Sequence, residues 1–480
     1  MADDLHYQSA TELSAAIRSR EVSSREVLEV FIGRVAEHDG PINSVVTLDA
    51  EGARREAAAA DEALVHGEAT GPFHGLPMTV KDSWQTAGMR TTSGAPELAE
   101  FVPQVDAWPV AALRRAGAVI FGKTNLPIYA GDFQSYNDVF GTTNNPFDPT
   151  RTPGGSSGGS AAALACGFTP LELGSDIGGS IRLPAHMSGV MGHKPSYGII
   201  PAHGQIPGPP GTLTQADLAV AGPMARAAAD LDAALTVLAG PDRWNSPAWR
   251  LELPPPRATE LAGYRIGAWL DDARCPVEAA VRALLEAAAA ALAGGGALVD
   301  PDVRPAFTLD KAADTFFTLL HSALSGSHPR EEIERMAGDT GSTAQSLIRR
   351  RTAIRHREWL SANERRLQMR LCWEELFSNW DALLLPVMPC PAIRHDHSEP
   401  MSSRTVRFSD RDWPYWEAAA WMAPAGACFL PATVVPVGTT SSGLPVGIQI
   451  VGPYLHDRTT IDIAGHLSSV VGGCPRPPRL

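Results

Sequence analysis

Lysine is scarce in this chain of 480 residues: of its 40 basic residues only four are lysines, Lys81, Lys123, Lys194 and Lys311. A GC-rich genome explains such a preference for arginine, and the many alanines agree with that explanation. The scarcity still has a useful consequence. If a lysine does chemistry in this protein, only four candidates exist.

Several other features are missing, and each absence excludes a class of protein. The net charge is −13 and no basic block occurs, which argues against a general nucleic-acid binder. No run of 18 uncharged apolar residues exists, so we expect no membrane-spanning helix. The first residues lack a basic segment followed by an apolar one, so we expect no secretory signal.

Cysteine and metal-binding patterns are also sparse. The six cysteines form no Cys-x-x-Cys pair, which is typical of a reduced, cytoplasmic protein rather than of a disulfide framework. No His-Glu-x-x-His occurs, and His395-x-His397 lies in a polar stretch where chance explains it best. We therefore expect neither a metal nor an organic cofactor. The six cysteines are Cys166, Cys275, Cys372, Cys390, Cys428 and Cys474.

Helical and strand-like segments alternate along the chain, which predicts an α/β protein. Ser9-x-x-Glu12 and Ser23-x-x-Glu26 have the pattern of capping boxes, so two helices are expected within 9–38. The segment 264–303 predicts a strand, a helix and a second strand, and the prolines within 245–256 mark a linker. Further strands are expected at 42–48, 76–80, 118–121, 171–174, 383–387, 432–437 and 446–451, further helices at 51–65, 160–166, 225–239, within 310–380 and at 458–470, and irregular chain at 144–159 and 184–210.

Two motifs match well-known patterns but lack the required context. Gly117-x-x-x-x-Gly122-Lys123-Thr124 fits a phosphate-binding loop, yet its middle residues, Ala-Val-Ile-Phe, are typical of a strand. Gly154-x-Ser156-x-Gly158 fits a nucleophile elbow, but prolines at 146, 149 and 153 exclude the strand that must precede one. We therefore place Lys123 at the end of a buried strand and do not expect a Ser-His-Asp hydrolase.

The small-residue runs that contain these glycines point to a different site. Gly154-Gly-Ser-Ser-Gly-Gly159 and Gly178-Gly-Ser180 allow backbone amides to approach a substrate closely, and Asp176 and Arg182 flank the second run. With Gly75-Leu-Pro-Met-Thr-Val-Lys-Asp82, Gly222-Pro-Met-Ala-Arg226 and Leu444-Pro-Val-Gly-Ile-Gln449, these runs resemble the amidase signature family of serine amidohydrolases. The resemblance spans nearly the whole chain and is weakest at about 300–425.

That resemblance implies a set of site residues. Ser180 would be the nucleophile, Ser156 a bridging serine in a cis peptide, and Lys81 the base. Backbone N–H groups of Ile177, Gly178, Gly179 and Ser180 would form the oxyanion hole, with Ser157, Asp176 and Arg182 in support. Gln134, Tyr136, Trp413 and Trp416 are candidates for substrate binding; Tyr415 and Trp421 belong to the same aromatic cluster, which packing explains equally well.

Elementary chemistry agrees with these roles. A serine hydroxyl needs a base to become a nucleophile. Lys81 serves as one only if its pKa falls by roughly 3 units from about 10.4, and burial at the end of an apolar strand acts in that direction. Glycines beside Ser180 let amides point at a developing oxyanion, an effect worth about 3–4 kcal/mol per donor.

The resemblance further implies one α/β/α sandwich domain, residues 1–480, around a large mixed sheet. N-terminal helices would occupy 1–70, the signature core about 71–240, a more variable and mostly helical region about 260–425 over the site, and C-terminal strands and a helix 426–480. The implied activity is hydrolysis of a small carboxylic amide through an acyl-enzyme, and a homodimer is the candidate assembly.

Alternatives follow from the same residues. The chain could be the glutaminase component of a tRNA-dependent amidotransferase, although the stretches 129–137 and 217–223 look more like stand-alone amidases. The same triad could cleave esters, ureas or carbamates. A non-catalytic binding protein would not need Lys81, Ser156 and Ser180 together.

Overall fold

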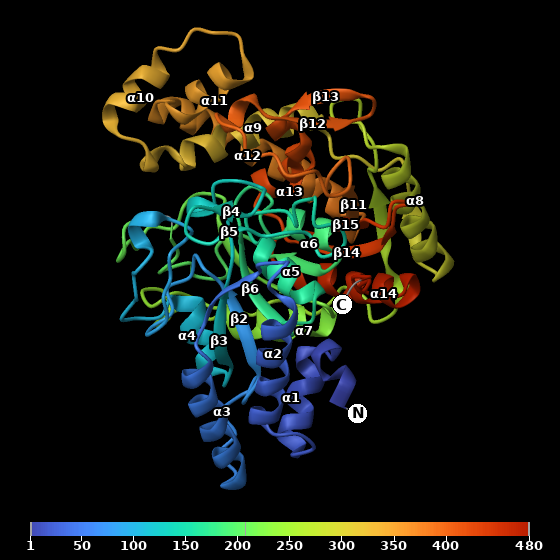
Figure 1. Ribbon diagram of the computed structural model, residues 1–480. Helices are drawn as coiled ribbons and strands as arrows, with labels where there is room; N and C mark the ends of the chain where they lie inside the picture. Colours follow the sequence, from blue (N-terminus) through green and yellow to red (C-terminus); the bar gives the residue numbers. More distant parts are fainter. Residues whose placement is uncertain (1, 207, 479–480) are drawn as a thin grey trace.

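The computed structural model of the chain describes residues 2–206 and 208–478, and Figure 1 shows helices packed around a central sheet. The strands are β1 (Val45–Leu48), β2 (Pro77–Lys81), β3 (Val119–Thr124), β4 (Tyr136–Asn137), β5 (Gly141–Thr142), β6 (Leu171–Asp176), β7 (Met191–Lys194), β8 (Val220–Ala225), β9 (Arg265–Ala268), β10 (Leu298–Asp300), β11 (Ala382–Pro386), β12 (Thr405–Phe408), β13 (Arg411–Pro414), β14 (Ala432–Thr439) and β15 (Pro445–Val451). Within the described ranges, eleven of them form one sheet in the order β1-β3-β2-β6-β8-β7-β14-β15-β11-β9-β10. Its strand pairs are both parallel and antiparallel, so the predicted mixed sheet is confirmed.

The helices surround this sheet. They are α1 (Ala10–Ser19), α2 (Ser24–His38), α3 (Ala50–Val65), α4 (Trp108–Arg115), α5 (Gly158–Ala165), α6 (Arg182–Ser188), α7 (Ala228–Leu238), α8 (Ala279–Gly294), α9 (Leu309–Ala323), α10 (Arg330–Ala337), α11 (Ala344–Thr352), α12 (His356–Phe377), α13 (Ala423–Ala427) and α14 (Asp457–Val471). The short 3-10 helices are η1 (Ala2–Tyr7), η2 (Pro96–Leu98), η3 (Ile128–Ala130), η4 (Leu261–Gly263), η5 (Ser325–Ser327), η6 (Met401–Ser403) and η7 (Tyr415–Met422).

Strand β14 shows how the two faces of the sheet are covered. Successive side chains of a strand point to opposite faces. Thr433 shares a hydrogen bond with Thr460 of α14, while the next residue, Val434, lies beside Gly447, which packs against the backbone of His186 in α6. Helices α6 and α14 therefore cover opposite faces, as an α/β/α sandwich requires.

The amino-terminal helices are fixed by their first turns. Ser9 and Ser23 both form the predicted capping boxes with Glu12 and Glu26. Asp230 of α7 adds a second cap to α1, because its carboxylate accepts hydrogen bonds from the backbone N–H groups of Ala10 and Thr11 at 2.9 and 2.8 Å. A residue 220 positions away thereby joins α1 to α7.

A helical region formed by α9–α12, together with the β12–β13 hairpin, lies at the end of the molecule opposite α1–α3 (Figure 1). The predicted helices of 310–380 are thus confirmed. The predicted strand–helix–strand unit is confirmed too, since β9 and β10 flank α8 and pair in parallel. No helix in the described residues is both long and apolar enough to cross a membrane.

Two expectations about the middle of the chain were wrong. The segment 184–210, expected to be irregular, contains most of α6 and strand β7. Pro184 does not prevent the helix, because it falls in the first turn of α6, where a missing backbone N–H removes no helical hydrogen bond. The helix expected from 225 begins at Ala228, and the residues before it form β8, in which Pro223 pairs with Leu173 of β6.

We expect Asp230→Ala to lower the free energy of unfolding by about 2–3 kcal/mol, because it removes the acceptor from two backbone donors at the start of α1. Asp232→Ala on the same helix is the matched control: its side chain is 45% exposed, and its ion pair with Arg458 is 3.4 Å long, so the cost should stay below about 1 kcal/mol. Urea unfolding of both variants measures the difference. Equal losses would contradict the capping role of Asp230.

Candidate active site

Lys81 lies at the carboxyl end of β2, a strand buried along its whole length between β3 and β6. Its side chain is fully buried, and its Nζ donates hydrogen bonds to Ser156 Oγ at 2.6 Å and to Ser175 Oγ at 2.9 Å. Burial lowers the pKa of Lys81 to about 7, against the opposing attraction of Asp176 and Glu172. The amine is therefore neutral in a large fraction of molecules near neutral pH.

Lys81 shares a lowered pKa with two other lysines. Burial also lowers the pKa of Lys123 to about 8 and that of Lys194 to about 7. Their contacts differ, however. Lys123 Nζ binds threonine hydroxyls and the backbone of Trp84, and Lys194 Nζ binds the carbonyls of Pro195 and Leu430 at 2.8 Å each. Of the three, Lys81 has serine hydroxyls as its hydrogen-bond partners, so geometry rather than pKa distinguishes it.

Ser156 follows a cis peptide bond, Gly155–Ser156, and is 1% exposed. The loop around it is held against residues 132–135. A Cβ at Gly155 would lie 2.7 Å from the backbone carbon of Phe133, so only glycine fits there. Ser135 Oγ donates to the carbonyl of Gly154 at 3.0 Å and accepts from the N–H of Gly158 at 3.2 Å.

Ser180 lies in the tight turn between β6 and α6 and is 8% exposed. Its carbonyl accepts a hydrogen bond from the N–H of Ser157 at 3.1 Å, which joins the two serine-bearing loops directly. Among the described residues, no hydrogen bond connects the hydroxyls of Ser180 and Ser156. Such catalytic hydrogen bonds often tighten only when substrate is bound.

The turn that carries Ser180 is shaped by Asp176 and Arg182, which are both fully buried. Arg182 donates two hydrogen bonds to the Asp176 carboxylate at 3.1 and 3.0 Å, and the N–H of Ile181 adds another at 3.1 Å. Burial by itself would raise the pKa of Asp176, but the Arg182 guanidinium holds it below its ordinary value. Arg182 also reaches Gln449 of β15 at 3.2 Å, so the pair connects the turn to the sheet.

The backbone donors near Ser180 are not equivalent. The N–H of Gly179 donates to Asp176 Oδ1 at 2.9 Å and is therefore occupied. Within residues 2–206 and 208–478, no hydrogen-bond acceptor is found for the N–H groups of Ile177, Gly178 and Ser180. Ile177 and Gly178 are also partly exposed, so of the four predicted donors these three can face an oxyanion.

The four predicted substrate-binding residues have different surroundings. Gln134 is buried and binds Tyr415 Oη and the backbone of Asp396, and Tyr136 Oη accepts from Arg404 at 2.7 Å. Trp413 stacks on Phe408 within the β12–β13 hairpin. Trp416, by contrast, is partly exposed and packs edge-on against Phe133, whose backbone touches Gly155.

Other candidate sites carry no comparable chemistry. The part of the chain that the structure describes holds no group of three or more His, Cys, Asp or Glu side chains placed for a metal, and His395 and His397 lie side by side without a third ligand. Lys123 falls within β3, which agrees with the strand predicted there and leaves no phosphate-binding loop.

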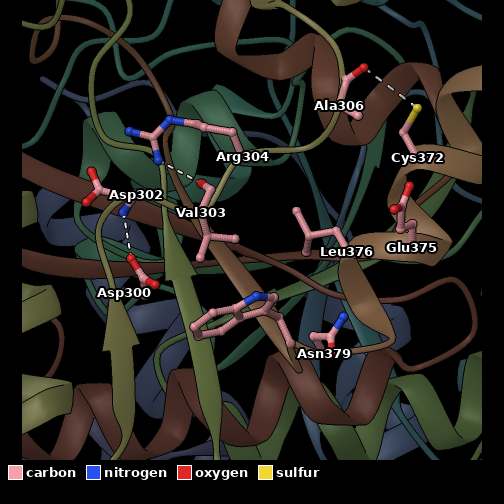
Figure 2. Close-up of a pocket in the computed structure, with 10 residues that line it drawn as sticks. Asp300, Asp302, Val303, Arg304, Ala306, Cys372, Glu375, Leu376 and Asn379 are labelled. Carbon is pink, nitrogen blue, oxygen red and sulfur yellow. Dashed lines mark hydrogen bonds between the residues drawn. The ribbon is translucent and has the colours of Figure 1, made fainter.

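An open cavity of about 440 Å³ lies between the end of β10 and α12 (Figure 2). Its acidic groups and Arg304 are largely engaged locally: Asp300 accepts from the N–H of Asp302, and Arg304 donates to the carbonyl of Val303. None of the predicted site residues lines it. Its lining residues are Asp300, Asp302, Val303, Arg304, Ala306, Cys372, Glu375, Leu376, Asn379 and Trp380.

Two residues at the site had no assigned role in the sequence analysis. Ser175 is the second hydrogen-bond partner of Lys81, and its backbone N–H and carbonyl both contact Ser157 Oγ. Glu172 is buried on β6, where burial raises its pKa to about 7, and it accepts a hydrogen bond from Thr79 of β2. Only the pairing of β2 with β6 reveals either of them.

Comparisons with known proteins agree with this geometry. The sequence model of the family described as "Amidase" matches residues 26–461. The chain is 32% identical to the A subunit of glutamyl-tRNA(Gln) amidotransferase from Synechococcus sp. (strain CC9605), covering 93% of each protein, and 33% identical to its counterpart from Moorella thermoacetica, covering 96% of each. The crystal structure of a bacterial aryl acylamidase of the amidase signature family superposes with a TM-score of 0.83 at 25% identity, over 98% of this chain and 97% of that one.

Acetylation of the native protein by a water-soluble succinimidyl ester should modify Lys311, which is exposed, and spare Lys81, Lys123 and Lys194, which are at most 1% exposed. In concentrated urea all four should react. Peptide mass spectrometry of the two samples reads out each site. Acetylation of native Lys81 at the rate of Lys311 would contradict the buried position of its amine.

Proposed function

The chain belongs to the amidase family and is an amidohydrolase, and we propose that Ser180 is its nucleophile, Ser156 its proton bridge and Lys81 its base. The observation that carries this proposal is the fully buried Lys81 amine, 2.6 Å from the hydroxyl of Ser156. The loop of Ser156 is hydrogen-bonded to the carbonyl of Ser180, and the N–H groups of Ile177, Gly178 and Ser180 have no acceptor among the described residues.

In the proposed reaction the Ser180 oxygen attacks the carbonyl carbon of a small amide. Its proton passes to Ser156 Oγ while the proton of Ser156 passes to neutral Lys81. The negative charge that forms on the substrate oxygen faces the N–H groups of Ile177, Gly178 and Ser180. Collapse of this intermediate breaks the C–N bond, and the proton returns from Lys81 through Ser156 to the leaving amine or ammonia.

The second half of the reaction runs the same relay with water. Water takes the place of the amine and attacks the acyl carbon bound to Ser180 Oγ, while one of its protons passes through Ser156 to Lys81. The bond between the acyl carbon and Ser180 then breaks, the serine regains its proton, and the carboxylic acid leaves. Each residue of the proposed relay ends the cycle in the protonation state in which it began. The scheme uses no cofactor.

A second candidate function is supported by the names of the curated relatives, which are A subunits of glutamyl-tRNA(Gln) amidotransferases. In that role the same three residues would release ammonia from glutamine beside partner proteins. Co-purification of this chain with such partners would favour that role. Hydrolysis of esters, ureas or carbamates is a third use of the triad, and rates on matched amide and ester substrates separate it from amide hydrolysis.

A small amide substrate and a reducing, cytoplasmic setting complete the proposal. All six cysteines are unbridged. Cys166, Cys275, Cys390 and Cys428 are buried, and burial raises the pKa of each thiol, which keeps the thiols protonated and unreactive. These thiols are suited to packing, so Ser180 remains the proposed nucleophile.

Replacing the proposed nucleophile or base should lower amide hydrolysis far more than replacing a lysine outside the site. Ser180→Ala should reduce amide hydrolysis to background, and Lys81→Ala should lower kcat on the order of 1000-fold or more, because it removes the proposed acceptor of the serine proton. Lys311→Ala is the matched lysine control and should keep kcat within about twofold, since Lys311 is exposed on α9. Full activity of Lys81→Ala at neutral pH would refute the assignment.

The pH dependence follows from the pKa of Lys81. The amine must be neutral to accept a proton, and its pKa in the folded protein is lowered to about 7. We expect kcat/KM to rise about tenfold per pH unit below this midpoint and to level off above it. A pH–rate profile on an uncharged amide measures this, and a profile that stays level through the midpoint would contradict it.

A further inference from the structure

Apolar side chains form a series of contacts between the Ser156 loop and the Ser180 turn. On the Ser156 side, the backbone of Phe133 touches Gly155, and the Phe133 ring meets Trp416 of η7 edge-on, with centroids 5.5 Å apart. Phe133 is 2% exposed, while Trp416 is only partly buried. The indole of Trp416 is thus a large apolar group that keeps contact with solvent near the site.

On the Ser180 side, two glycines next to the nucleophile contact apolar side chains. A Cβ at Gly178 would lie 3.5 Å from Leu320 of α9, and one at Gly179 would lie 2.7 Å from Met422. Leu320 and Met422 are at most 3% exposed. The backbone on the N-terminal side of Ser180 therefore packs against hydrocarbon.

His321, the residue after Leu320, is the last member of this group of side chains. Its ring lies edge-on to Trp416, with centroids 6.4 Å apart, and is 6% exposed. Burial lowers the pKa of His321 to about 4, so the imidazole is uncharged at neutral pH. Its Nδ1 is buried and has no hydrogen-bond partner in the part of the chain that the structure describes. We call Phe133, Leu320, His321, Trp416 and Met422 the apolar wall.

Four ion pairs lie around the apolar wall. Asp176 pairs with Arg182 at 3.0 Å behind Ser180, and Asp132, next to Phe133, pairs with Arg404 at 2.6 Å. The other two pairs are Glu417, next to Trp416, with Arg274, and Arg351, over the Phe317 ring, with Asp314. None of these charges is left over to neutralise a charged substrate.

Resting on the proposed function, we propose that the substrate is an uncharged amide whose apolar or aromatic substituent contacts Leu320, His321 and Trp416. Transfer of a charge into such surroundings without a counter-ion is strongly unfavourable, whereas an aromatic ring gains contact area and edge-to-face packing against Trp416. Free glutamine brings an ammonium and a carboxylate, and the four ion pairs named above offer neither of them an unpaired charge. The apolar wall therefore favours neutral amides as substrates over the glutaminase role.

The first test compares kcat/KM for three amides: an uncharged aromatic amide such as benzamide, the small uncharged acetamide, and glutamine. The expected order is benzamide above acetamide, with glutamine lower than benzamide by on the order of 100-fold or more. Hydrolysis of glutamine at a rate equal to or above that of benzamide would overturn the proposal. So would a preference for acetamide over benzamide.

The second test removes the aromatic part of the apolar wall. Trp416→Ala should lower kcat/KM for benzamide about tenfold and leave that for acetamide within about threefold, because acetamide has no ring to contact the indole. Trp249→Ala is the matched control, since Trp249 is 64% exposed and belongs to no part of the site. An equal loss on both substrates would show a structural role for Trp416 and overturn the assignment.

Labelling by methanesulfonyl fluoride separates failure of this inference from failure of the proposed function. The reagent forms a sulfonate ester with an activated serine oxygen and releases fluoride, and it is too small to depend on the apolar wall. Labelling of Ser180 combined with a preference for glutamine would overturn the apolar-substrate proposal alone. Absence of labelling on Ser180 in a folded, amide-hydrolysing protein would overturn the triad itself.

Discussion

The desolvation of one amine is the constraint on which the site depends. Lys81 ends a strand buried between two others, and its amine donates hydrogen bonds to two serine hydroxyls. A buried ammonium without a carboxylate at hydrogen-bond distance is unfavourable, so the neutral form is favoured and the pKa falls to about 7. The same burial that stabilises the sheet thus favours the neutral form of this amine. Lys123 and Lys194 show that burial alone is common among the lysines of this protein, and that the neighbouring serines make the difference.

Hydrogen bonds and close packing hold the two loops that carry Ser156 and Ser180 in place. Asp176 and Arg182 shape the turn of Ser180, and Arg182 also donates a hydrogen bond to Gln449 of β15. Ser135 and the close approach of Gly155 to Phe133 hold the loop of Ser156. Both loops contact the helical region through the apolar wall. These contacts come from different parts of the fold: Lys81 ends a strand of the sheet, Ser156 and Ser180 lie in loops outside the strands, and the apolar wall comes largely from α9 and η7.

Much of this could be predicted from local sequence. The capping boxes, the paired strands around α8 and the terminal hairpin follow from short-range patterns, and the structure has them. Strand β7 within 184–210 and strand β8 before the helix expected from 225 could not be predicted, because both are stabilised by pairing with strands distant in the chain rather than by their own propensity. The same holds at the site, where Ser175 and Glu172 meet β2 only through strand pairing.

The sequence by itself determined the family, the fold class and the few residues able to act as a base, because these depend on residue types and spacing within short segments. Tertiary structure alone decided which buried lysine faces a serine, which backbone N–H groups of the described residues stay without an acceptor, and which apolar side chains lie beside the Ser180 turn. Gly179 shows the reason. Its N–H is taken by Asp176, three residues earlier, and only the folded turn brings that carboxylate within 2.9 Å. Hydrogen bonds depend on direction and distance in space, which a linear pattern does not record.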